Sequence, residues 1–469
     1  KLVAGASAFY MKNWEQTNHH LSTIVKYLPA EHQARRMLAV SQLELGLVGD
    51  ISDTLHDFSA VNESDAKFLA SLSYKLLELG AVDEAKQLVE QSGELASSNA
   101  KQSARQGILK LMMNDPSGMQ NLQEAVKLNP ELIEAELALA FSAVQTGNIE
   151  QATVIANKWE KQYPNKAGAF NLMATIHIKQ KDYAKAEQAL EQSLMVEPNN
   201  AFALIEQVRV AAFQKNMSLA KERAEYLIKL YPNNNKALRL YFGLNRNEAA
   251  LQKLMVAYQL DTADLQKGML VSEALVNLKQ TDKALQILNS FDKNSKLTKR
   301  YWQLLVLIYK RQQDENSVQL TLDKWRKASP FHLEPIVLLA DFYTNKRNYE
   351  RALAVVNNGF EHHANNLTLQ LVKMQLLLND KQIYQAKELY RTLVERDIDD
   401  GLKQGLKGRI YLLEEKYKLA IPKLETLYKT YASSQNALYL ASAHQGNQDI
   451  SQAISVLEGY LLKHENDDR

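Results

Sequence analysis

The chain has 469 residues, of which 46% are hydrophobic, and its 56 basic and 54 acidic side chains leave a formal net charge of +2. This balance argues against a nucleic-acid ligand, because a basic surplus drives binding to phosphates. The absence of cysteine excludes disulfides, thiolate metal sites and cysteine nucleophiles. The longest uninterrupted apolar run, Leu304 to Tyr309, is far shorter than the roughly 20 residues that span a bilayer.

The composition favours an all-α protein. Only nine prolines and seventeen glycines occur, and Ala, Leu, Gln, Lys and Glu are abundant. These abundant residues lose little side-chain entropy in a helix.

A small residue returns at a near-constant interval along the whole chain, and we expect it in the first turn of the second helix of each of fourteen helical hairpins. Of the thirteen intervals, ten are 34 residues, two are 33 and one is 30, and ten of the fourteen residues are alanine. These anchor residues are Thr17, Ile51, Ala85, Gly118, Ala152, Ala186, Ala220, Ala250, Ala284, Val318, Ala352, Ala386, Ala420 and Ala453.

The prolines support the same register independently. Six of the nine lie twelve residues after an anchor: Pro29, Pro130, Pro164, Pro198, Pro232 and Pro330. Proline has no amide proton and cannot continue a helix, so each of these prolines should mark the end of a second helix.

With this period the chain resembles the tetratricopeptide repeat family, whose pattern of aromatic, Leu, Gly/Ala, Tyr, Ala and Pro positions it follows. The copy around Ala186 supplies Phe170, Met173, Ala174, Tyr183, Leu190 and Pro198. The resemblance implies a right-handed superhelical solenoid of about fourteen hairpins. It also implies a concave groove that is lined mainly by the first helix of each hairpin. Such hairpins bury their apolar faces only by stacking on their neighbours.

The interval of 30 residues divides the repeats. We expect repeats 1–7 in residues 1–234 and repeats 8–14 in residues 235–469, as one continuous solenoid with a shortened repeat near 235–262. The missing four residues are about one helical turn, which predicts a short first helix from about Lys236 to Leu244 and a change of curvature there. Neither end shows a polar capping helix, so we expect a segment of a longer array.

Candidate chemical sites are few, and each has a structural explanation. We expect His19-His20 and His362-His363 on second helices, where adjacent side chains point about 100° apart and do not share a metal. Gly401, Gly405 and Gly408 lack the spacing of a phosphate loop, and the acidic run at 397–400 resembles an inter-hairpin turn more than a calcium loop. We therefore predict no catalytic residue, cofactor or metal; an enzyme fused to the array is the remaining alternative.

The resemblance implies that partners bind at the fifth, ninth and twelfth positions of each repeat, on the first helices. We expect a protein or peptide ligand there, with a polysaccharide as the other ligand class; the alternative is a row of ordinary solvated side chains. The candidate groove residues are Arg36, Tyr74, Phe141, Asn171, Thr175, Arg209, Arg239, Glu273, Lys310, Asp341 and Arg409.

A narrower resemblance concerns three segments near the start: "VAGASAFYMKNW", "YLPAEHQARRMLAVSQLELG" and "VKLNPELIEAELALAF" at Val126 to Phe141. They are similar to bacterial tetratricopeptide lipoproteins of the PEP-CTERM/exosortase and exopolysaccharide systems. The resemblance implies a periplasmic scaffold for exopolysaccharide assembly or export or for protein sorting, tethered by a lipid anchor upstream. The alternatives are a cytoplasmic adaptor of the same fold and a periplasmic guide that binds the polysaccharide directly.

Overall fold

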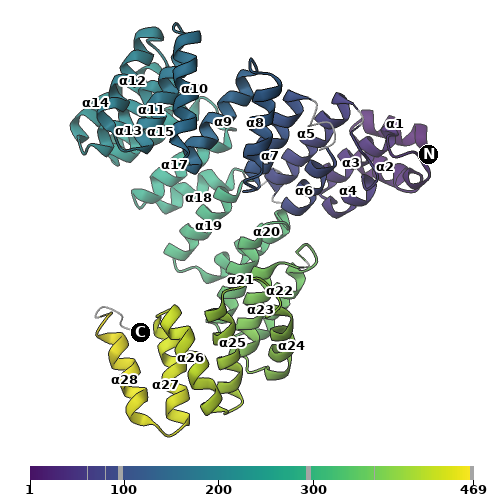
Figure 1. Cartoon of the computed structure of the whole chain (residues 1–469), viewed down its shortest axis with the longest axis vertical. Helices are drawn as coiled ribbons and strands as arrows, with labels where there is room; N and C mark the ends of the chain where they lie inside the picture. The colour runs from purple at the N-terminus through teal and green to yellow at the C-terminus, as the bar shows by residue number, and fades with distance from the viewer. Residues whose placement is uncertain (61, 80, 93–98, 292–296, 364, 465–469) are drawn as a thin grey trace. The chain divides into compact units, whose positions relative to one another are not determined.

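A computed structural model describes the whole chain except residues 61, 80, 93–98, 292–296, 364 and 465–469. Its described part contains 28 α-helices, one short 3₁₀ helix and no strand. Figure 1 shows the course of the chain. None of the helices within these described residues is long and apolar enough to cross a membrane. The chain forms two compact units, Lys1–Val318 and Gln319–Arg469. The all-α solenoid predicted from the sequence is confirmed.

The first unit holds α1 to α19 and the start of α20. Its helices are α1 (Leu2–Tyr10), α2 (Trp14–Leu21), η1 (Val25–Tyr27), α3 (Gln33–Leu45), α4 (Val48–Thr54), α5 (Glu63–Leu79), α6 (Val82–Gln91), α7 (Ala100–Met112), α8 (Gly118–Leu128), α9 (Ile133–Thr146), α10 (Ile149–Gln162), α11 (Ala167–Lys179), α12 (Tyr183–Val196), α13 (Ala201–Phe213), α14 (Met217–Leu230), α15 (Asn235–Asn245), α16 (Glu248–Gln259), α17 (Leu265–Asn277), α18 (Thr281–Asn289) and α19 (Lys299–Arg311).

Helix α20 (Glu315–Ala328) begins in the first unit and ends in the second. The second unit continues with α21 (Leu333–Asn345), α22 (Tyr349–Gly359), α23 (Leu367–Asn379), α24 (Ile383–Leu393), α25 (Asp400–Leu413), α26 (Tyr417–Thr430), α27 (Ser434–Gly446) and α28 (Ile450–Leu461).

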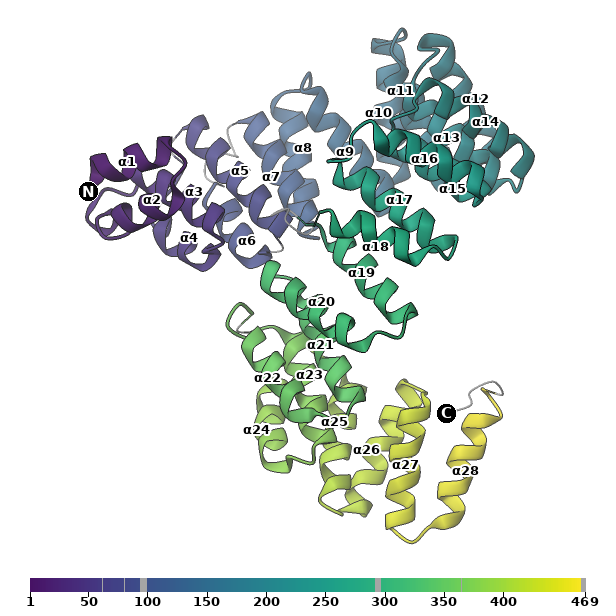
Figure 2. The ribbon, with the colours of Figure 1, turned by 180° about the vertical axis from the view of Figure 1, so that it is seen from behind.

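Within the two units the helices pair into thirteen of the fourteen predicted hairpins, and hairpins adjacent in the chain pack side by side (Figures 1 and 2). The remaining predicted hairpin, α19 with α20, extends over both units. All fourteen anchors are buried in second helices. First helices of successive hairpins also touch, as α11 does with α9 and α13. The small anchor therefore lies where two helices come closest.

Helix ends follow local chemistry. Five of the six periodic prolines lie two residues after the last residue of a second helix, as Pro198 does after α12, and Pro29 follows the 3₁₀ turn η1. Asn and Asp cap many helix starts: Asp182 accepts from the Lys185 amide and Asn216 from the Leu219 amide. Such a cap satisfies one of the amides that a helix start leaves without a partner.

Among the described residues, thirteen of the turns between paired helices hold one left-handed residue, which lies five residues before most anchors. At Gly46 and Gly147 glycine supplies it, with φ of 75° and 85°. In most other hairpins a residue other than glycine adopts the left-handed conformation, as Lys181 and Lys215 do at φ 61°. The turn therefore has the same backbone conformation in these hairpins, although most of them lack glycine, the residue that adopts a positive φ most readily.

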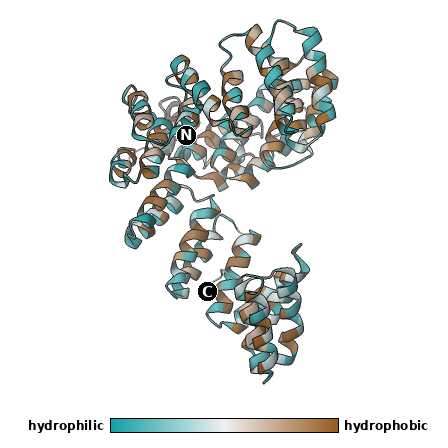
Figure 3. Cartoon of the chain, turned by 90° about the vertical axis from the view of Figure 1, so that its left-hand side faces the viewer, coloured by the Kyte–Doolittle hydropathy of each residue, from teal (hydrophilic) through white to brown (hydrophobic). Residues whose placement is uncertain are grey.

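Polar and apolar residues share every helix (Figure 3), and the apolar stripes join into cores that cross hairpin boundaries. One cluster runs from Ala104 on α7 through Leu122, Leu139 and Trp159 to Ile176 on α11. A hairpin removed from this stack would expose that stripe, which is the physical reason for an array.

The short first helix is confirmed: α15 has 11 residues, whereas its counterparts α13 and α17 have 13 each. The predicted change of curvature and the division at residue 234 stay predictions. Gly408 has a packing role instead of a phosphate-binding one, because a methyl group there would lie 2.9 Å from Leu424 Cγ.

The placement of His362 and His363 on a helix is wrong. Helix α22 ends at Gly359, and both histidines lie in the following turn. Gly359 packs closely on Ile336 and Leu369, and the His363 Nε2 lies 3.2 Å from the Pro330 carbonyl oxygen. The helix thus ends where Gly359 lies close to its own hairpin and to the next one, and His363 contacts the preceding hairpin.

Candidate binding groove

All eleven candidate residues lie on first helices, as predicted. Nine belong to the unit Lys1–Val318, and Asp341 and Arg409 belong to the unit Gln319–Arg469. They are spread over ten helices, so the structure does not gather them into one pocket. Two of them one repeat apart, Arg239 and Glu273, are in direct contact. The contacts of the eleven residues separate them into three groups.

The first group holds charges that tie adjacent repeats together. Arg36 on α3 forms an ion pair with Asp65 at the start of α5, and Asp65 is buried. The Arg36 guanidinium also lies 5.3 Å and 5.5 Å from the ring centres of Phe58 and Phe68. The aromatic rings and the carboxylate together hold the cation in the packing between repeats.

Glu273 on α17 joins three successive repeats. Its two carboxylate oxygens accept from Arg239 on α15 at 2.5 Å and from Arg300 on α19 at 2.8 Å. The Glu273 side chain is only 12% exposed, whereas both arginines are more than half exposed. The arginines therefore keep donors toward solvent while the carboxylate fixes their position.

Arg409 on α25 is buried, at 7% exposure. It donates to Gln375 and, at 3.0 Å, to Asn379 on α23, and its guanidinium lies 4.4 Å from the ring centre of Tyr439 on α27. Burial lowers the pKa of Arg409 from its ordinary value. A cation held by neutral amides and a ring face links three hairpins of this unit.

The second group makes polar contacts within or beside its own hairpin. Asn171 on α11 accepts from Ser193 at 2.7 Å and donates to Asn200 at 3.3 Å, while the Thr175 hydroxyl donates to the Asn171 carbonyl. Arg209 pairs with Glu206 on its own helix at 2.7 Å. Asp341 accepts from Asn345 one turn later, at 3.3 Å.

The third group is open to solvent. Tyr74 on α5 is 45% exposed and Phe141 on α9 is 38% exposed, and Lys310 on α19 is exposed as well. The carboxylate of Glu78, one turn along α5, raises the pKa of Tyr74. Aromatic side chains of this kind offer large contact area at a small cost in conformational entropy.

The partners of the first group were not predicted from the sequence. Gln375 lies 34 residues before its partner Arg409. Glu273 lies 34 residues after its partner Arg239. Both pairs are therefore separated by one repeat period. Asp65 carried no such signal because it lies at a helix start, 29 residues after Arg36. The two adjacent repeats place it beside the arginine.

No group of three or more His, Cys, Asp or Glu side chains that could hold a metal occurs among the described residues. His19 and His20 lie on α2 with ring centres 5.3 Å apart. Asp399 caps α25 by accepting from the Leu402 amide, so the acidic run at 397–400 forms an inter-hairpin turn, as predicted. Glu414 and Glu415 also lie in a turn, after α25.

Buried small anchors and stacked hairpins define a helical repeat protein. On its first helices Tyr74, Phe141 and Lys310 are exposed to solvent. Comparisons with known proteins indicate which kind of repeat protein this is. The tetratricopeptide repeat family model matches residues 167–200, the hairpin of α11 and α12. That hairpin is a tetratricopeptide repeat, and the match supports membership of the chain in the superfamily. Tetratricopeptide repeat proteins bind protein partners and are in general scaffolds without catalytic activity.

A curated relative, the protein CTR9 homolog of Arabidopsis thaliana, is 26% identical over 217 residues, which are 43% of this chain and 20% of the relative. The matched segment thus spans a fifth of that protein's length.

Among solved structures, Cut9–Hcn1 of the APC/C aligns at 11% identity and a TM-score of 0.33, over 80% of this chain and 89% of the other. TTC0263, a tetratricopeptide repeat protein of Thermus thermophilus, aligns at 18% identity and a TM-score of 0.32, over 38% of this chain and 99% of the other. At these TM-scores neither structure adds to the argument.

Proposed function

We propose that the chain is a non-catalytic scaffold that binds an extended segment of a protein partner along its first helices. The open aromatic side chains of Tyr74 and Phe141 carry this proposal. Both rings are exposed on first helices, whereas most of the other candidate side chains are engaged with neighbouring residues, so these two rings are available as anchors. Buried aromatic anchors dominate the energetics of many protein interfaces.

Selection of a displayed random peptide library on the full chain tests this proposal. We expect enriched peptides to bind with micromolar affinity and to lose about tenfold or more when Tyr74→Ala and Phe141→Ala are combined. Tyr384→Ala is the matched control, because Tyr384 is 77% exposed but lies on the second helix α24. Enriched peptides that bind the double variant and the parent chain equally well would refute the proposal.

Direct binding of a polysaccharide is the second candidate function, and the same two aromatic rings favour it. Sugar rings stack on exposed aromatic faces, and other first helices offer hydrogen-bond donors in Arg209 and Lys310. A glycan array probed with the chain and the double variant separates the two functions. Glycan retention that requires both rings supports the polysaccharide, and binding of peptides alone supports the protein partner.

The setting that we propose is a bacterial cell envelope, with a role in exopolysaccharide assembly or export or in protein sorting. It rests on the resemblance of three segments near the start of the chain. The coding sequence upstream of Lys1 tests it: a signal peptide followed by a lipid-attachment cysteine supports a membrane-tethered periplasmic protein. A protein that starts without any signal supports the cytoplasmic adaptor instead.

A further inference from the structure

The outward face of α14 and α16 differs from the same face of every other hairpin. Six residues after the anchor, twelve hairpins carry a polar residue or glycine, whereas α14 carries Tyr226 and α16 carries Val256. Both are exposed, Tyr226 by 52% and Val256 by 58%, and Leu260 at the end of α16 is 70% exposed. The shortened repeat thus coincides with an apolar patch on second helices.

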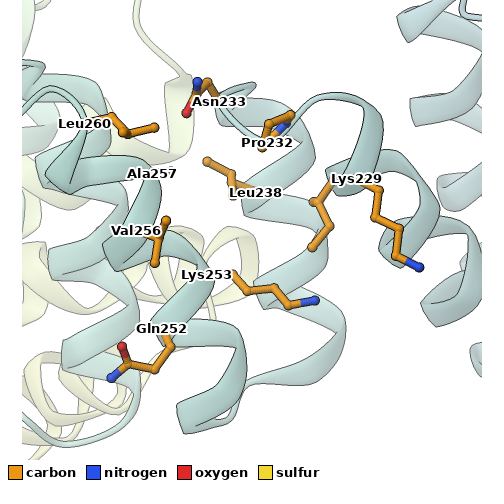
Figure 4. Close-up of a pocket in the computed structure, with 10 residues that line it drawn as sticks. Lys229, Pro232, Asn233, Leu238, Gln252, Lys253, Val256, Ala257 and Leu260 are labelled. Atoms are coloured by element: carbon orange, nitrogen blue, oxygen red, sulfur yellow. The ribbon is translucent and has the colours of Figure 1, made fainter.

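A pocket of about 360 Å³ opens beside this patch, between the end of α14, the short α15 and α16 (Figure 4). Leu238, Val256 and Leu260 line it together with Pro232, and Lys229 lies at its edge. A second pocket of similar volume lies on the other side of α14 and is lined in part by Glu222 and Tyr226. Helix α14 is therefore a ridge with a hollow on each side.

The exposed charges of the ridge are arranged for pairing with a copy of itself. Glu222, Tyr226 and Lys229 lie at i, i+4 and i+7, on one face of α14, and all three are exposed. In an antiparallel pair of α14 helices related by a two-fold axis near Tyr226, Glu222 of each copy faces Lys229 of the other. The corresponding residues of α16, Gln252 and Gln259, then face each other as amides.

We propose that this face binds a second copy of the chain, in a symmetric contact of α14 and α16 centred on Tyr226 and Val256. An isologous contact of this kind requires a surface that complements itself under a two-fold rotation. The charge order along α14 meets that requirement, and the apolar residues lie at its centre with the charges outside, as in protein interfaces generally. This contact is independent of the groove on the first helices, so either proposal stands without the other.

The contact is small. Helices of 14 and 12 residues are about 20 Å long and pack about 10 Å apart, so the two faces cover roughly 400 Å² per copy. A standard stable interface buries about 800 Å² per partner. We therefore expect a weak dimer that forms as the concentration rises.

Sedimentation velocity of the full chain from about 5 to about 500 µM tests the proposal. The sedimentation coefficient should rise with concentration toward that of a dimer, and Tyr226→Asp should abolish the rise. Glu222→Lys or Lys229→Glu should each weaken association about tenfold, since each places two like-charged pairs across the axis. The exchange of both charges in one chain should restore association.

Lys161→Glu is the matched control, because Lys161 occupies on α10 the position that Lys229 occupies on α14. It should leave association unchanged, and circular dichroism should show equal helix content in all variants. A chain that stays monomeric at every concentration overturns the proposal. This is the result expected if the patch binds an acidic peptide instead of a second copy. Failure of the charge exchange to restore association overturns it too.

Discussion

Helices α7 and α8 approach each other closely at Gly107 on α7. A methyl group added there would lie 2.8 Å from the Gly118 carbonyl oxygen and 2.9 Å from Leu122 Cγ. The Leu122 amide nitrogen would lie at 3.1 Å. Two of these three atoms belong to the backbone of α8, so the overlap is relieved only by moving one helix away from the other.

We therefore expect Gly107→Ala to destabilise the α7–α8 hairpin by about 1–3 kcal/mol, the usual cost of overpacking. Helix propensity acts in the opposite direction, since alanine is favoured over glycine by about 1 kcal/mol inside a helix. The steric cost has to exceed that gain for the net effect to be destabilising. Gly243→Ala on α15 isolates the gain, because nothing lies within 4 Å of a methyl group there.

Hydrogen exchange resolved to peptides is the suitable assay, because stability in a repeat array is distributed over its neighbours and global unfolding need not be two-state. Amides of α7 and α8 should exchange about tenfold faster in Gly107→Ala, which corresponds to about 1.4 kcal/mol. Gly243→Ala should slow exchange in α15. If Gly107→Ala were neutral or protective, the close packing of this hairpin would not limit its side chains, and the reasoning would fail.

Further predictions concern the contacts between and within hairpins. Arg409→Lys should destabilise the unit Gln319–Arg469 by about 1–2 kcal/mol in urea unfolding, because lysine cannot contact two amides and a ring at once. High salt should leave this difference unchanged, since no carboxylate takes part in these contacts. The hydrogen bond from Lys387 lowers the pKa of Glu414, so this contact stabilises the fold above the ordinary glutamate pKa and loses its effect as the pH falls through the lowered value. Lys387→Gln should thus reduce the stability at pH 7 by less than ~1 kcal/mol, and this loss should shrink as the pH falls below the ordinary glutamate pKa; a loss that does not change with pH would contradict the assignment. Lys215→Gly should stabilise its hairpin by about 0.5 kcal/mol in thermal unfolding, because glycine adopts a φ of 61° without steric strain but loses more chain entropy.

The repeat register was predictable because it follows from a single geometric need. A helix crossing accepts only a small side chain, so anchors such as Ala186 and Ala220 recur, and a proline follows the helix that they begin. The shortened α15 followed from the same count of residues. Period and composition thus predicted the fold class, the ends of the second helices that a proline follows, and the short α15.

The turns inside the hairpins were less predictable. A left-handed position is usually occupied by glycine, as at Gly147, yet Lys181 and Lys215 adopt the same backbone conformation. The packing of the two helices imposes this conformation, and no local signal in the sequence records it. The end of α22 before His362 was also missed, because no proline marks it; the helix ends at Gly359, which lies close to Ile336 and Leu369.

The position of the candidate groove residues on first helices was predicted, but the surroundings of their side chains were predicted only in part. All eleven candidates lie on first helices, but the sequence did not reveal that Arg409 is buried or that Glu273 holds two arginines. These environments depend on residues one repeat away, which a pattern within a single repeat does not include. The patch around Tyr226 and Val256 was missed because attention to first helices leaves the second helices aside.

The central claim is that hairpins stack in chain order, so that residues one repeat apart on the first helices are neighbours. Because the chain has no cysteine, introduced thiols react without background. With a short bismaleimide, the pair Arg239→Cys and Glu273→Cys should cross-link efficiently, since α15 and α17 are in contact. Arg239→Cys with Leu307→Cys, two repeats apart and roughly 20 Å away, should not. Equal cross-linking of the two pairs would contradict the stacked array.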